Sequence, residues 1–61
     1  MEIVKQKVLI VDDDPAQRFA LEVSLRGPGR IFHHAADGDA ALELAVLEMP
    51  DIIITDHHIR A

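Results

Sequence analysis

The stretch Lys7-Val8-Leu9-Ile10-Val11-Asp12-Asp13-Asp14-Pro15 is an apolar run that ends abruptly at acidic residues and a proline. Residues 8–11 are apolar on both faces and too few for a helix, which is typical of a buried parallel strand. Asp14 followed by Pro15 indicates a helix start, because aspartate is a good N-cap and proline needs no amide partner in the first turn. The stretch therefore predicts a strand that leads directly into a helix.

Alternating strand and helix patterns continue along the rest of the chain. We expect a first helix over about residues 15–26, a weak edge strand over 31–36, a second helix from Asp37, and a third strand over 52–55. The apolar stripe expected on the first helix consists of Ala16, Phe19, Ala20 and Val23. The order β-α-β-α-β with short connections predicts an α/β fold built from right-handed crossovers onto a parallel sheet.

Length and composition limit the classes of protein to which the chain can belong. With 61 residues it forms one domain at most, and its 49% hydrophobic content argues against disorder. The absence of cysteine excludes disulfide scaffolds and thiolate zinc sites. A net charge of −5 without clustered basic residues argues against direct nucleic acid binding, and no apolar run is long enough to span a membrane. We therefore expect a cytoplasmic protein whose acidic groups hold cations.

Acidic residues follow the first and third predicted strands. Asp12 and Asp13 come after one strand and Asp56 after the other, and parallel strands place these ends at the same edge of the sheet. Carboxylates that close repel one another unless a pKa rises or a cation binds. An oxygen-only set of ligands suits Mg²⁺, and a carboxylate beside it can attack a phosphoryl donor. The pattern predicts a magnesium site with Asp56 as the candidate nucleophile.

Structural roles compete with this interpretation. Asp14 and Asp37 each stand immediately before a predicted helix, and we assign both as N-caps. Turn geometry could explain the other aspartates one at a time, so composition and spacing leave both interpretations open. The doublets His33-His34 and His57-His58 resemble metal ligands, but neighbours on a strand point to opposite faces, so neither doublet can chelate one ion.

Three blocks of the sequence, residues 8–14, 36–44 and 50–56, together resemble the receiver domain of two-component response regulators. The resemblance implies a flavodoxin-like fold in which the first strand lies between the second and the third, giving the order 2-1-3. It implies that Asp56 accepts a phosphoryl group from a histidine kinase or phosphotransfer protein. It also implies that Mg²⁺ is bound by Asp12, Asp13, Asp56 and the backbone carbonyl of His58.

A receiver is a signalling module and not a classical enzyme, and at most it catalyses its own Mg²⁺-dependent phosphorylation and dephosphorylation. Two alternatives remain open. The chain could be a structural or association segment that accepts no phosphate. It could also belong to a haloacid-dehalogenase-like phosphatase with Asp12 as the nucleophile, although that motif has threonine or valine where this chain has Ala16.

The family fold has five strands, and residues 1–61 match its part from the first strand to the third. Residues 52–54 are apolar on both faces, which predicts an interior strand with no partner for its outer edge in this chain. We expect either a longer polypeptide or two copies that pair or swap to complete the sheet. We also expect phosphoacceptor activity to be impaired in the 61 residues alone.

Overall fold

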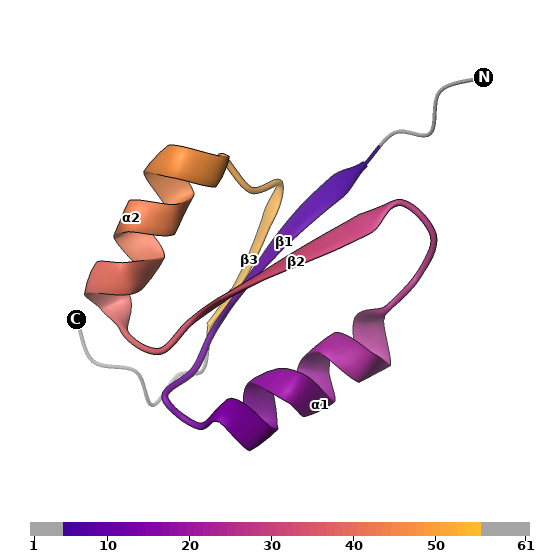
Figure 1. The fold of residues 1–61 in the computed structure, drawn as a ribbon, viewed down its shortest axis with the longest axis horizontal. Helices are drawn as coiled ribbons and strands as arrows, with labels where there is room; N and C mark the ends of the chain where they lie inside the picture. The colour runs from indigo at the N-terminus through magenta and orange to yellow at the C-terminus, as the bar shows by residue number, and fades with distance from the viewer. Residues whose placement is uncertain (1–4, 56–61) are drawn as a thin grey trace.

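A computed structural model describes residues 5–55, which form one parallel sheet with a helix on each face. The elements in chain order are β1 (Gln6–Val11), α1 (Pro15–Leu25), β2 (Arg30–Ala35), α2 (Gly38–Glu48) and β3 (Ile52–Thr55). The sheet order is β2-β1-β3, and both pairings of β1 are parallel (Figure 1). This is the order and topology expected of a partial flavodoxin-like fold.

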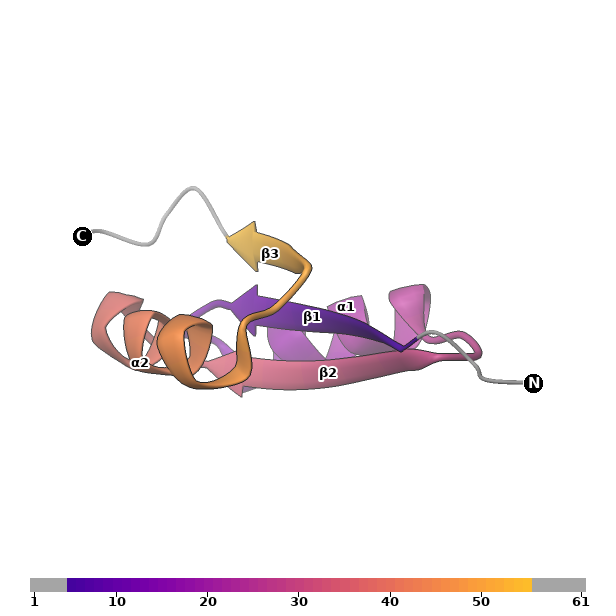
Figure 2. The ribbon, with the colours of Figure 1, turned by 90° about the horizontal axis from the view of Figure 1, so that it is seen from above.

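The core is centred on β1, the middle strand. Figure 2 shows α2 on one side of the sheet and α1 on the other. The α2 side contains the buried cluster, in which strand residues pack against one face of the helix: Leu9, Val11 and Ala35 against Ala40, Ala41 and Leu44. Both faces of β1 are covered, which is why apolar and polar residues do not alternate along its last four positions.

Side-chain caps start both helices, as expected from the sequence. The Asp14 carboxylate accepts a hydrogen bond from the amide of Ala16 at 3.0 Å, and the Asp37 carboxylate accepts one from the amide of Ala40 at 2.8 Å. Each cap satisfies an amide that has no partner inside the helix. Helix α2 ends at Glu48, and the next residue, Met49, has a left-handed φ of 50° that turns the chain toward β3.

The apolar stripe predicted for α1 is wrong about which face packs on the sheet. Phe19 is 62% exposed and Val23 is 48% exposed. The positions that are partly covered include Leu21 and Leu25, together with the polar Glu22. The helix is therefore rotated relative to the expectation, so that its polar residues next to the sheet make specific contacts there.

Among residues 5–55, β3 pairs only with β1 and so lies at an edge of the sheet. Ile52 is 38% exposed and Ile53 is 51% exposed, although the apolar sequence predicted an interior strand. Within the described part of the chain, no helix is long and apolar enough to cross a membrane.

Neighbouring histidines connect β2 to both helices. His33 Nε2 lies 3.6 Å from Glu48 Oε1 on α2, and His34 Nε2 lies 2.7 Å from Glu22 Oε1 on α1. Glu48 also approaches Lys7 of β1, whose Nζ donates to the Glu48 carbonyl at 3.0 Å. The two imidazoles point to opposite faces, as the strand geometry requires, so each holds a different helix.

The contacts of Glu22 make acid stability a testable property. Its hydrogen bond with His34, then its hydrogen bond with Arg26 at 3.1 Å, lower the pKa of Glu22 below its usual value. A lowered carboxyl pKa contributes stability that is present above the unfolded-state pKa and is lost as the pH falls through the folded-state pKa. We expect Glu22→Gln to lower stability at neutral pH and to approach the wild type in acid.

Urea unfolding of the full chain at about pH 7 and at about pH 3 would measure this difference. Glu43→Gln on α2 is the matched control, because Glu43 forms no ion pair or side-chain hydrogen bond with any other of residues 5–55. A difference between Glu22→Gln and the wild type that stays constant across this pH range would contradict the prediction.

Candidate functional site

The carboxyl-terminal edge of the sheet brings together the ends of β1 and β3. Val11 is paired with Thr55, so the two strands end at the same level. In the sequence an aspartate follows each of them, Asp12 after β1 and Asp56 after β3. Two of the expected site residues, Asp56 and His58, lie outside the described residues.

Asp12 is the only charged residue buried within the described part of the chain, at 2% exposure. Its amide donates to the Ala35 carbonyl at 3.0 Å, which extends the β1–β2 ladder by one residue. Its Oδ1 accepts from the Asp14 amide at 2.9 Å, and its carbonyl accepts from Arg18 Nη1. Three atoms of Asp12 are thus held by hydrogen bonds, so its carboxylate has a defined orientation at the end of the strand.

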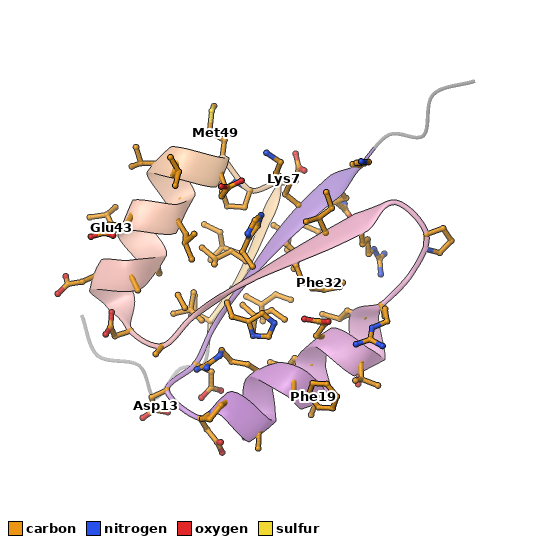
Figure 3. The ribbon with its side chains drawn as sticks, viewed as in Figure 1. Lys7, Asp13, Phe19, Phe32, Glu43 and Met49 are labelled. Atoms are coloured by element: carbon orange, nitrogen blue, oxygen red, sulfur yellow. The ribbon has the colours of Figure 1, made fainter. Side chains whose placement is uncertain are left out.

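Asp13 is the next residue and is exposed on the loop between β1 and α1 (Figure 3). Asp14 differs from both, because its carboxylate is engaged as the cap of α1. Of the three consecutive aspartates, Asp12 and Asp13 therefore remain the candidates for binding a ligand. One is buried and oriented, and the other is accessible to solvent.

These two carboxylates fit a hard divalent cation. Oxygen ligands with retained waters are what Mg²⁺ prefers, and both carboxylates stand at the end of β1. The described residues alone do not bring three potential metal-binding side chains together. Asp12 and Asp13 would thus supply part of a coordination sphere that needs further oxygen ligands.

Sequence reasoning missed Arg18 as a residue of this edge, because it falls off the expected apolar stripe of α1. Its place one turn after the Asp14 cap was the available signal, since helical side chains lean back toward the N-terminus. The guanidinium consequently reaches the Asp12 carbonyl at the end of the strand.

Comparisons with known proteins agree with this geometry. The family described as response regulator receiver domain matches residues 8–60. The chain is 48% identical over 52 residues to "Probable transcriptional regulator ycf27" of Guillardia theta. The matched segment covers 85% of this chain and 20% of that protein. It is 41% identical over 58 residues to "DNA-binding response regulator MtrA" of Mycolicibacterium smegmatis, covering 92% of this chain and 25% of that protein.

A third relative is "Transcriptional regulatory protein PdtaR" of Mycobacterium tuberculosis, with 43% identity over 54 residues that cover 87% of this chain and 26% of that protein. The chain thus spans about a fifth to a quarter of the length of these relatives. No solved structure matches it significantly. With the family match over residues 8–60, the 2-1-3 parallel sheet and the acidic end of β1, the chain belongs to the response regulator receiver domain family.

Proposed function

We propose that this chain is the phosphoacceptor part of a two-component phosphorelay, with Asp56 as the acceptor and a histidine kinase or phosphotransfer protein as the donor. The register of β1 and β3 is the observation that carries the proposal. Val11 and Thr55 are partners, and an aspartate follows each of them in the sequence. Membership of the receiver family supports the same role.

In the proposed reaction, a carboxylate oxygen of Asp56 attacks the phosphorus of a phosphohistidine. A phosphorus–oxygen bond forms, the phosphorus–nitrogen bond breaks, and the electron pair of that bond stays with the leaving imidazole. The product is an acyl phosphate. Bound Mg²⁺ would neutralise charge on the transferring oxygens.

The proposed ligands of Mg²⁺ are Asp12, Asp13, Asp56 and the backbone carbonyl of His58. Asp12 is held in orientation by its contacts with Ala35 and Asp14, which reduces the motion that metal binding must restrict. Asp13 is exposed and can approach an ion from the solvent side.

We further propose that residues 1–61 form the part of a receiver from its first strand to its third, and that these residues alone are impaired as an acceptor. The exposed apolar edge of β3 supports this, because Ile52 and Ile53 are poorly covered. Further strands of the same polypeptide would cover that edge, and pairing with a second copy along β3 is the alternative.

The test is to incubate the full chain with Mg²⁺ and a small acyl phosphate, then to measure its mass and map the modified peptide. We expect a phosphoryl mass gain on the peptide that contains Asp56, and no gain when a chelator removes Mg²⁺. Modification of the peptide containing Asp12 would instead favour the phosphatase-like alternative. A folded chain that gains no mass would favour a structural segment.

A further inference from the structure

Arg18 lies near the start of α1, yet its side chain is directed toward the end of β1. Its Nη1 donates to the Asp12 carbonyl. Its Nε is buried and has no hydrogen-bond acceptor within residues 5–55. Because a buried guanidinium N–H without an acceptor is unfavourable, the hydrogen bond to the Asp12 carbonyl is the contact that fixes this side chain among residues 5–55.

The contacts of Arg18 close a ring of hydrogen bonds around the loop that carries the acidic pair. The backbone amide of Arg18 donates to the Asp14 carbonyl at 3.1 Å, and the Asp14 amide donates to Asp12 Oδ1 at 2.9 Å. The guanidinium then returns to the Asp12 carbonyl. Arg18 thereby contacts the main chain on both sides of Asp13, through its guanidinium at the Asp12 carbonyl and through its backbone amide at the Asp14 carbonyl. Only the first of these contacts depends on the side chain.

We propose that Arg18 is a positioning residue that holds Asp12 and Asp13 in the geometry required to bind a divalent cation. This inference rests on the proposed cation site and adds a residue that is not itself a ligand. The charge of Arg18 and its positioning role predict opposite effects on cation affinity. A guanidinium close to a cation site repels the cation, whereas a guanidinium that orders the ligands favours binding.

The experiment measures Mg²⁺ affinity by following the backbone amide signals of the full chain during titration. Arg18→Met removes the charge and the donor but keeps the length of the side chain, and we expect it to weaken affinity by about 10-fold. Arg18→Lys keeps a charge and one donor, and we expect it to stay within about 3-fold of the wild type.

Two control variants separate the possible causes. Arg26→Met removes the arginine that follows the last residue of α1 and pairs with Glu22, at the other end of the helix from the acidic loop, and it should leave Mg²⁺ affinity unchanged. Asp13→Ala should abolish most of the binding, because it removes a proposed ligand. The amide spectrum without Mg²⁺ reports whether each variant is folded.

Tighter or unchanged Mg²⁺ binding by Arg18→Met would overturn the positioning role while leaving the cation site intact. A wild type that does not bind Mg²⁺, or an Asp13→Ala variant that binds equally well, would overturn the cation site itself and the role of Arg18 with it. If Arg18→Met does not fold, the guanidinium signal of the wild type decides. It should shift on Mg²⁺ addition together with the amides of residues 12–14, and an unmoved signal would contradict the proposal.

Discussion

Asp56→Asn is expected to reduce the Mg²⁺-dependent phosphoryl mass gain of the full chain to background. Asparagine has nearly the shape of aspartate, but its neutral amide lacks the nucleophilic oxygen that forms an acyl phosphate. The substitution also removes one proposed ligand of Mg²⁺, which acts in the same direction. The measurement is intact-protein mass after incubation with the acyl phosphate donor.

Asp51→Asn is the matched control for this experiment. Asp51 precedes β3 and accepts a hydrogen bond from the Lys7 amide at 2.8 Å. It therefore lies where the strands begin, at the other end of β1 from Asp12. Asparagine can accept the same bond, and we expect the phosphoryl gain to persist. A gain that survives Asp56→Asn and disappears in Asp12→Asn would assign the nucleophile to Asp12.

Leu9→Ala is expected to lower the free energy of unfolding by about 2–5 kcal/mol, the range for truncating a buried leucine. Leu9 is completely buried in the central strand and has neighbours on both β2 and β3. It also belongs to the buried cluster that packs against α2. Strands on both sides limit how far the surroundings can close the cavity. Such a loss is a large fraction of the stability of a small domain.

The matched control is Leu47→Ala on α2, because the same chemical change is made at a side chain that is 76% exposed. We expect its effect to stay within about 0.5 kcal/mol. Urea unfolding of the full chain measures both values. Equal losses for the two substitutions would contradict the placement of the core on β1.

Much of the fold could be predicted from local patterns. The apolar run of β1 and the capping aspartates each act over a few residues, and the elements formed close to their expected bounds. The resemblance added the strand order, which the sheet confirms. Asp12 at the tip of β1 was likewise predictable, because it directly follows the last strand residue.

The packing face of α1 could not be predicted in the same way. Leucines and alanines repeat around this helix, so its periodicity allows more than one apolar stripe. The sheet beneath it presents His34, which contacts Glu22 at 2.7 Å, and this places a glutamate on the side of the helix that faces the sheet. Hydrophobic periodicity places charged residues such as Glu22 toward solvent. It contains no information about a histidine on a strand that the glutamate meets only after folding.

The order of the elements, the caps of both helices and the acidic residues that follow β1 and β3 could be inferred from the amino-acid sequence, because each of these depends on neighbours along the chain. Three other features became known only from the packed fold: the covered face of α1, the glutamate that each histidine contacts, and the reach of Arg18 to the Asp12 carbonyl. These features depend on how a helix is rotated against a sheet. That rotation is set by side chains that meet only when the elements pack together.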